Sequence, residues 1–430
     1  MSTALKLDEL GVILTGKTPK TSSPEFWSGN VPFYTPSDMN GGRRLDEVKR
    51  YITDEGLKTV KNSAIPPNSV MVSCIGSVGN ICISDKYGVT NQQINTIIPN
   101  EDIIYYLYLY YSLLPRKAEL EMLASGGSVL PIINKSDFSQ LEIVVPPLKD
   151  QKAIAHILGT LDDKIELNQK MNKTLEGIAK AIFKSWFVDF DPVRAKAEGR
   201  PTGLPPEISD LFPDELVDSE IGEIPEGWEV TIVSGFGNVI CGKTPSTKDP
   251  DNFGGQFPFI TIPDMRDNLI SLLTDRSISE KGASALKGKM LPAGSICVSC
   301  IATPGLVSIT TRDSFTNQQI NSIVPLSEGD REYLLFSMMT LGDLISSAGS
   351  GGSVFANLST GRFKELPMLQ PNEQTRNAFS KIIRPMLQRI ELSQEEISTL
   401  SQLRDTLLPQ LISGELRIPD AEKFLEEAGI

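Results

Sequence analysis

Two segments of the chain match the phosphate-loop pattern GxxxxGK[ST], Gly11–Thr18 and Gly237–Thr244. In nucleotide hydrolases this loop lies between a buried strand and a helix, and its amides and lysine bind phosphates. Here the interior residues, VILT and NVIC, favour a strand, and a proline two residues after each lysine would end a helix early. A nucleotide hydrolase remains an alternative, but we expect Lys17 and Lys243 on turns at strand ends.

Other catalytic arrangements are incomplete. Asp38, Glu47 and Lys49 could form a nuclease-like set of carboxylates and a lysine, but the second half of the chain retains only Asp264. The single histidine, His156, leaves no Ser-His-Asp or Cys-His combination and no histidine-rich metal site. We therefore predict no catalytic residues and no bound metal.

The cysteines and glycines do not point to catalysis either. The CxxC at Cys297 and Cys300 lies in the run SICVSCI, which predicts a buried strand, and the odd count of 5 cysteines is no disulfide framework. A methyltransferase would need a glycine-rich cofactor loop and, for adenine, an Asp/Asn-Pro-Pro-aromatic turn, and neither is present. We predict a protein that is not an enzyme itself.

Composition is that of an ordinary globular protein, with 430 residues, 40% hydrophobic and 22% charged. The net charge of −13 argues against a chain that holds nucleic acid by charge alone. The sequence contains no run of 18 apolar residues and no apolar signal core at its start, so we expect a cytoplasmic protein.

An internal repeat organises the chain. Four short motifs each occur twice at one constant offset: GKTP at Gly16 and Gly242, Asp-Met at Asp38 and Asp264, VSCI at Val72 and Val298, and TNQQIN at Thr90 and Thr316. GGSV also occurs twice, at a slightly shorter offset. A constant offset over such a length indicates a duplicated unit. Each copy combines short strand-like runs with helical stretches, one of them from about residue 102 to 125 in the first copy, which predicts an α+β fold.

Each copy ends in a long helix with an apolar seam. Steps of four and three residues give one ladder in each copy, both in the same phase, Ile154, Leu158, Leu161, Ile165, Asn168, Asn172, Leu175, Ala179, Ile182 and Trp186, then Phe379, Ile383, Met386, Ile390, Ser393, Ile397, Leu400, Arg404, Leu407 and Leu411. Helices of roughly 50 Å need a partner to cover such a seam. Antiparallel pairing would place Asn172 opposite Ser393 and Ala179 opposite Met386. Alternatively, each helix packs on its own domain or forms a homodimer.

The predicted domain boundaries follow from the repeat and from proline-rich stretches. They are a first domain at 1–147, a helix at 148–186, an acidic, extended Pro/Gly-rich linker at 187–222, a second domain at 223–372, a helix at 373–416 and a tail at 417–430.

The duplicated unit, the TNQQI motif, the linker KSWFVDFDPVRAKAEG with LFPDELVDSEIGEIPEGWEV, and the ending LLPQLISGEL resemble the specificity subunit of type I restriction-modification systems. The resemblance covers nearly the whole chain. It implies two target-recognition domains held apart by two antiparallel helices, each domain reading one half of a bipartite, asymmetric DNA target.

The resemblance also implies partners. Two modification subunits, which carry S-adenosylmethionine and methylate adenine, would dock on the helices, and a motor-nuclease subunit using ATP and Mg would join for cleavage. The partner would flip the adenine out of the duplex. A coiled-coil adaptor without DNA binding is the third alternative.

The repeat helps to choose candidate DNA contacts. Residues identical in both copies cannot encode two different half-sites, so Asn91, Gln92 and Gln93, with Asn317, Gln318 and Gln319, should brace the fold or touch the DNA backbone, as should Lys17, Lys243, Ser128 and Ser353. Aligned loops that diverge are the candidates for base contact. They are Lys20, Ser37, Asn40, Arg43, Arg44 and Ser77 in the first domain and Lys248, Arg266, Asp267, Asn268 and Thr303 in the second.

Overall fold

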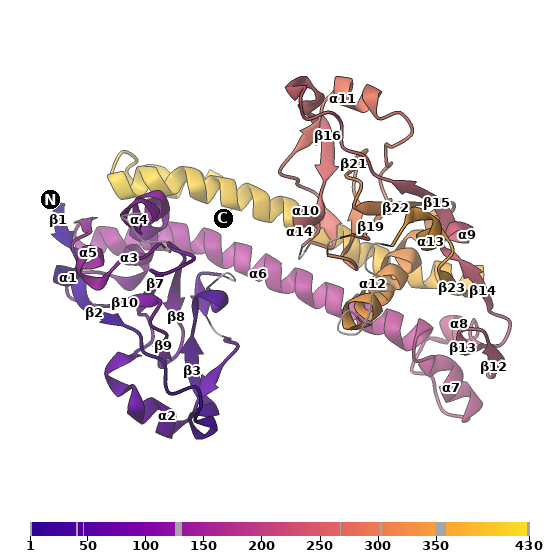
Figure 1. Ribbon diagram of the computed structural model, residues 1–430, viewed down its shortest axis with the longest axis horizontal. Helices are drawn as coiled ribbons and strands as arrows, with labels where there is room; N and C mark the ends of the chain where they lie inside the picture. Colours follow the sequence, from indigo (N-terminus) through magenta and orange to yellow (C-terminus); the bar gives the residue numbers. More distant parts are fainter. Residues whose placement is uncertain are drawn as a thin grey trace. The chain divides into compact units, whose positions relative to one another are not determined.

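A computed structural model of the chain describes residues 2–39, 42–45, 47–124, 131–266, 268–301, 303–348 and 358–427. The chain forms two compact units, the first from Met1–Asn168 with Glu396–Ile430 and the second from Gln169–Glu395. Each unit contains one of the duplicated domains and part of both long helices, α6 (Leu148–Phe187) and α14 (Glu373–Ser413) (Figure 1). Within the described ranges, none of the helices combines the length and the apolar character needed to span a bilayer.

The first domain is built on a five-stranded sheet in the order β2-β10-β7-β8-β4. Its strands are β2 (Gly11–Thr15), β10 (Ile94–Pro99), β7 (Val70–Ser73), β8 (Ile81–Ser84) and β4 (Arg44–Leu45). All neighbours are antiparallel except β4, which runs parallel to β8. All residues of β7 and β8 are buried, as their continuous apolar sequences predict.

A smaller sheet and a two-stranded ribbon complete this domain. The sheet has the order β5-β3-β9-β6, and the ribbon pairs the domain's first strand with its last. The strands are β5 (Tyr51–Ile52), β3 (Trp27–Tyr34), β9 (Gly88–Thr90), β6 (Ala64–Ile65), β1 (Thr3–Lys6) and β11 (Glu142–Val145), and the short helices are α1 (Leu7–Leu10), α2 (Asp54–Thr59) and α5 (Lys135–Ser139).

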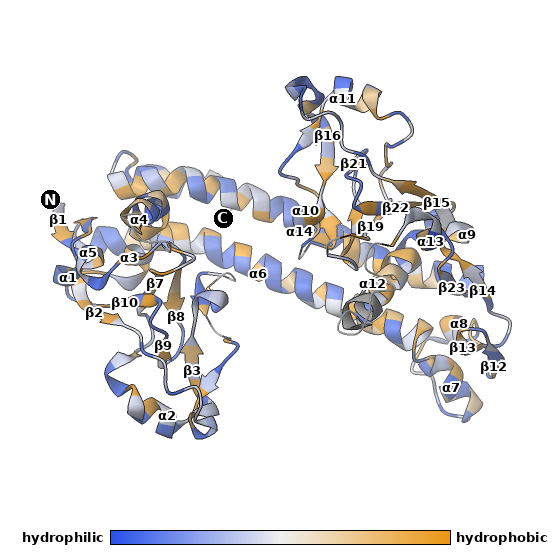
Figure 2. Ribbon diagram, in the orientation of Figure 1, coloured by the Kyte–Doolittle hydropathy of each residue, from blue (hydrophilic) through white to orange (hydrophobic). Residues whose placement is uncertain are grey.

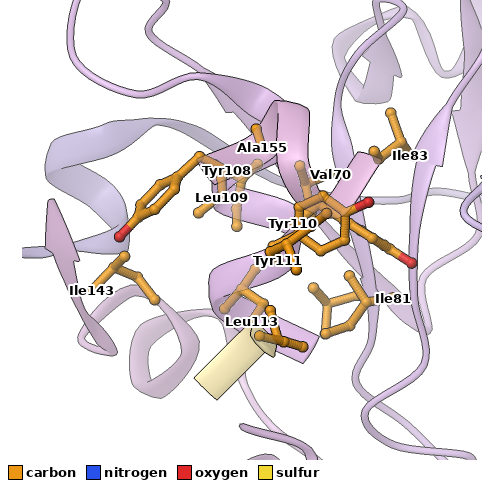
Figure 3. Packing of buried hydrophobic residues seen from close by; sticks show 14 of the residues in the cluster. Val70, Ile81, Ile83, Tyr108, Leu109, Tyr110, Tyr111, Leu113, Ile143 and Ala155 are labelled. Atoms are coloured by element: carbon orange, nitrogen blue, oxygen red, sulfur yellow. The ribbon is translucent and has the colours of Figure 1, made fainter. Parts of the chain in front are cut away.

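The helix expected from about residue 102 to 125 is instead two helices, α3 (Tyr106–Leu113) and α4 (Lys117–Ala124). Pro115 lies in the 3-10 turn between them and cannot donate a backbone hydrogen bond, so the α-helix is interrupted there. The buried side chains of α3 pack on β7 and β8 and on Ala155 of α6 (Figure 3).

The second domain repeats the five-stranded sheet and the two-stranded ribbon, but its smaller sheet has three strands instead of four. Its five-stranded sheet has the equivalent order β15-β22-β19-β20-β17. The strands of this sheet are β15 (Gly237–Cys241), β22 (Ile320–Pro325), β19 (Ile296–Ser299), β20 (Val307–Thr310) and β17 (Ile270–Ser271). The smaller sheet contains β16 (Phe253–Ile260), β18 (Ser277–Ile278) and β21 (Phe315–Thr316), and the ribbon pairs β14 (Glu229–Ile232) with β23 (Pro367–Gln370). The helices are α9 (Val233–Phe236), α10 (Ile262–Met265), α11 (Glu280–Ala285), α12 (Arg331–Ala348) and α13 (Thr360–Lys364). The predicted α+β duplication is confirmed.

The segment between α6 and the second domain differs from its prediction as an extended linker. It contains α7 (Asp191–Ala197), α8 (Pro206–Ser209) and a hairpin of β12 (Leu216–Ser219) and β13 (Gly222–Pro225). Contacts do order it, since Phe212 packs edge to face on Trp186 with ring centroids 5.1 Å apart. Isolated aromatic residues between prolines gave no periodic signal for these elements.

The two long helices pair in both units. In the first unit, Arg404 donates to Asp162 over 2.8 Å, and Asn168 donates to Glu396 over 3.0 Å. Residue numbers therefore rise along one helix as they fall along the other, which confirms the antiparallel arrangement. The predicted register places Leu161 opposite Arg404, and the observed partner, Asp162, is the next residue. Figure 2 shows apolar residues recurring along both helices.

Most predicted seam residues are buried. Ile154, Leu158, Leu161 and Ile165 share a core with Leu400, Leu407 and Leu411 in the first unit, with Ile397 at its edge. In the second unit, Trp186, Phe379, Ile383 and Ile390 are buried in one core, with Leu175, Ile182 and Met386 packed against it. Ser393 is buried, but no hydrogen bond joins it to Asn172.

A helix of ten residues, α15 (Ile418–Glu427), follows α14. Its Ala421 is fully buried in the core of the first unit, and Ile418 packs against the same core. The segment predicted as a tail is therefore helical in part.

The ion pair between the helices predicts a stability effect. Asp162 also accepts a 2.6 Å hydrogen bond from Tyr111, and its side chain is 7% exposed. Arg404→Met should lower the free energy of unfolding of the first unit by about 2 to 3 kcal/mol, because a buried carboxylate loses its charged partner. Urea denaturation of the full chain measures the change.

Arg417→Met is the matched control, because the Arg417 side chain is 81% exposed and forms a local ion pair with Asp420, three residues later. Its effect should stay within about 0.5 kcal/mol. Equal destabilisation by the two substitutions would contradict the role assigned to Asp162.

Candidate nucleic-acid interface

One end of the five-stranded sheet gathers three loops of the repeat. In the first domain, β2 and β7 end there, and β10 and β8 begin there, because these neighbours are antiparallel. The GKTP loop after β2, the VSCI loop after β7 and the TNQQ loop before β10 therefore lie side by side. The same holds for β15, β19, β20 and β22 in the second domain.

The GKTP and TNQQ loops of the first domain are joined by backbone contact. The amide of Lys17 donates to the Thr90 carbonyl over 2.9 Å, and the Thr18 hydroxyl donates to the Gln92 Oε1 over 2.5 Å. A Cβ atom on Gly16 would lie 2.0 Å from the Asn91 carbonyl oxygen. Only glycine fits this close approach.

The second domain repeats these contacts. Lys243 donates to the Thr316 carbonyl over 2.8 Å, Thr244 donates to Gln318 over 2.9 Å, and a Cβ atom on Gly242 would lie 2.1 Å from the Asn317 carbonyl oxygen. The motifs shared by both copies thus hold two loops together.

These contacts also bear on the phosphate-loop alternative. The segments Gly11–Thr15 and Gly237–Cys241 are strands β2 and β15, and no helix begins at Lys17 or Lys243. The geometry that a nucleotide phosphate requires is therefore absent from both patterns.

The asparagines of the TNQQ motif act within their own loop. Asn91 donates to Gln93 over 2.8 Å, and Asn317 donates to Gln319 over 3.1 Å. These contacts support the bracing role. Lys17, Lys243, Gln92 and Gln318 are exposed at the surface of the same sheet end.

The shared Asp-Met pair has a structural role as well. The Asp38 carboxylate accepts the Thr35 amide over 2.8 Å and the Lys49 amide over 3.2 Å, so it joins both ends of the loop between them. Asp264 bonds Thr261 and Asp275 in the same way, over 2.7 Å and 3.0 Å. This use of Asp38 favours a loop anchor over a nuclease-like carboxylate.

Each domain contains a stacked arginine–aromatic pair that was not predicted from the sequence. The Arg50 guanidinium lies 3.9 Å from the Trp27 ring centroid, and Arg276 lies 4.2 Å from that of Phe253. The two pairs occupy equivalent positions of the repeat, at the same offset as the TNQQIN motif, so alignment of the two copies could have found them. Stacking of this kind fixes the strand that follows the divergent loop.

Most residues predicted for base contact are exposed near this sheet end. Ser77, which is exposed, and Thr303, which is partly buried, occupy the same position in their loops, since Ser73 and Ser299 donate to their backbone carbonyls. Exposed candidates in the other loops are Lys20 and Ser37 in the first domain and Lys248, Arg266 and Asn268 in the second. Asn40, Asp267, Ser128 and Ser353 lie outside the described residues.

Arg43 and Arg44 lie elsewhere. Arg43 is 9% exposed and pairs with Asp163 of α6. Burial lowers the pKa of its guanidinium, but Tyr111 and Asp163 raise that pKa more, so the charge is firmly held. Arg44 donates to Asn68, which precedes β7 at the opposite end of the sheet, over 2.9 Å. These positions favour structural roles over base contact.

The CxxC prediction agrees with the structure. Cys297 lies in β19 and Cys300 directly follows it, and both are buried. Burial raises the pKa of the Cys297 thiol to about 12, so it stays protonated and unreactive.

Comparison with known proteins agrees with this duplicated architecture. The type I restriction modification DNA specificity domain family matches residues 3–177 and 225–402. The HindI type I restriction enzyme specificity subunit of Haemophilus influenzae is 35% identical, over 90% of this chain and 94% of its own length. The MjaIX specificity subunit of Methanocaldococcus jannaschii is 26% identical, over 96% and 93%.

A solved structure shares the fold. The type I restriction-modification S subunit from M. genitalium aligns with a TM-score of 0.59 over 96% of both chains, at 17% identity. Each of the two matched segments begins within four residues of a domain's first strand and extends into the long helix that follows the domain. The chain therefore belongs to the type I restriction-modification DNA specificity family and carries two copies of its domain.

Proposed function

We propose that this chain is the DNA-specificity subunit of a type I restriction-modification complex in which each domain reads one half of a bipartite, asymmetric target. One observation carries the proposal. Both domains hold their loops at the same sheet end with identical backbone contacts, Gly16 to Asn91 and Gly242 to Asn317, while the exposed side chains between those contacts differ. A common scaffold with different side chains suits two readers of different sequences.

Within these loops, divergent side chains are the proposed base contacts. Arginine suits the guanine O6 and N7 and asparagine suits adenine, so Arg266 and Asn268 are candidates in the second domain, as are Lys20 and Ser77 in the first. The shared Lys17, Lys243, Gln92 and Gln318 are proposed to contact the DNA backbone, which orients the protein without specifying sequence.

The long helices are proposed to dock two modification subunits. Leu167 and Ile178 of α6 and Leu392 of α14 are 66%, 42% and 57% exposed, and a partner subunit docked on the helices would cover such side chains. Partner subunits would supply S-adenosylmethionine for adenine methylation, and ATP and Mg for cleavage. They would also supply positive charge, since this chain carries a net −13.

A gel-shift experiment with the full chain and its modification subunits tests the proposal. We expect binding to a specific duplex that survives excess random DNA and does not need ATP, with weak binding by the chain alone. Equal binding to all duplexes, or ATP binding by this chain alone, would contradict it.

Exchange of one domain should change one half of the target. Replacing residues 1–147 with the corresponding segment of a relative should alter one half-site in the methylated motif and leave the other intact, because the loops of the second domain are unchanged. Sequencing of methylated genomic DNA gives the motif. A change in both half-sites would refute independent reading.

Insertion of one heptad into both α6 and α14 should lengthen the spacer between half-sites. Seven helical residues add about 10 Å, which is about three base pairs at 3.4 Å each. A seven-residue insertion after Gly203, in the exposed connection between α7 and α8, is the control and should leave the spacer unchanged. An unchanged spacer after the helix insertions would argue against this role of the helices.

A further inference from the structure

The first domain contains an open groove of about 440 Å³ between the loop that follows β7 and the start of α4. Its walls include Gly76, Ser77, Asn80, Lys117, Glu121 and Pro131. Among these residues, only Ser77 was predicted from the sequence to contact DNA.

The groove belongs to the sheet end that carries the candidate interface. The amide of Cys74 donates to the Gln93 carbonyl over 2.7 Å, which joins the groove loop to the TNQQ loop. Asn80 anchors the other end of the loop, because its amide donates to the Ser73 hydroxyl over 2.9 Å. DNA on this sheet end would therefore meet the mouth of the groove.

In the second domain the helix and the loop lie closer together at the equivalent position. Gly79 and Gly305 are equivalent, with φ of +86° and +97°, and each faces the helix at an equivalent position, Lys117 in one copy and Gly342 in the other. A Cβ atom on Gly342 would lie 2.3 Å from the Gly305 carbonyl, so α12 lies directly on its loop. In the first domain the Lys117 side chain separates the helix from Gly79.

The packing of the helix on this loop thus differs between two copies that share their scaffold, as readers of different half-sites require. Pro115 contributes to the difference, since it ends α3 before α4 begins at Lys117. The continuous helix α12 has no such break.

The charges in the groove indicate its ligand. The Lys117 Nζ and a Glu121 carboxylate oxygen are 4.0 Å apart, and the two side chains are 56% and 55% exposed. An exposed pair of this kind contributes little to stability. A phosphate would meet repulsion from Glu121, whereas a G·C pair offers acceptors at guanine O6 and N7 for lysine and an amino donor at cytosine N4 for glutamate.

We propose that this groove reads a G·C base pair in the major groove of the half-site bound by the first domain, with Lys117 donating to guanine and Glu121 accepting from cytosine. This inference rests on the proposed function and deepens it. Ser77, at the rim of the groove, lies where it would contact a neighbouring base or sugar.

The test uses the full chain with its modification subunits and duplexes that carry each base pair at every half-site position. Lys117→Met keeps the side-chain stem over Gly79 and removes the charge, so the fold should be retained. Methylation should lose its preference for G·C at one position of one half-site, by about fivefold or more. Glu121→Ala should relax the same position, and Lys117→Arg should retain the preference.

Lys58→Met, on the exposed side of α2, is the matched control and should leave the motif unchanged. Melting temperatures of all variants check folding. If the Lys117→Met variant methylates the same motif as the wild type, the inference about the groove is overturned and the proposed function is not. Uniform weakening on all sequences, with a smaller salt dependence, would show a phosphate contact and overturn it too. A wild-type complex without any bipartite motif would overturn the proposed function together with the inference.

Discussion

The apolar seam shared by α6 and α14 is the constraint on which the rest of the structure depends. Neither helix can expose such a stripe to water, and each covers the other within both units. Buried side chains of each domain pack against the two helices and enlarge the core that the helices form. Ala155 of α6 packs with α3 in the first unit, and Phe379 of α14 meets Phe336 of α12 in the second, with ring centroids 6.0 Å apart.

Polar contacts give this apolar packing a unique arrangement. Asp162 receives Arg404 from the opposite helix and Tyr111 from the first domain, so one carboxylate joins three elements. In the second unit the buried Glu332 binds Arg384 of α14. Burial raises the pKa of Glu332, but hydrogen bonds from Arg384 and the charge of Arg331 lower it more, so this carboxylate stays ionised. The two copies therefore use different residues for the same purpose.

Sequence reasoning identified features that depend on neighbouring residues or on the repeat. The run INTIIP is strand β10, and the seam ladder gave the pairing and nearly the register of the helices. It could not identify Arg43 as a buried residue, because its partner Asp163 is 120 residues away and no local pattern connects them. The groove at Lys117 was missed because its walls come from three separate segments of the chain.

Pairing of β1 with β11 brings the first and last strands of the first domain side by side, and β14 with β23 does the same for the second. The chain therefore enters and leaves each domain through two adjacent strands, and the second of these is followed by a long helix, α6 or α14. Genetic recombination with crossovers at these two points would transplant a complete reader without breaking any sheet. Such an exchange would combine existing domains in a new pair while each domain keeps its own loops.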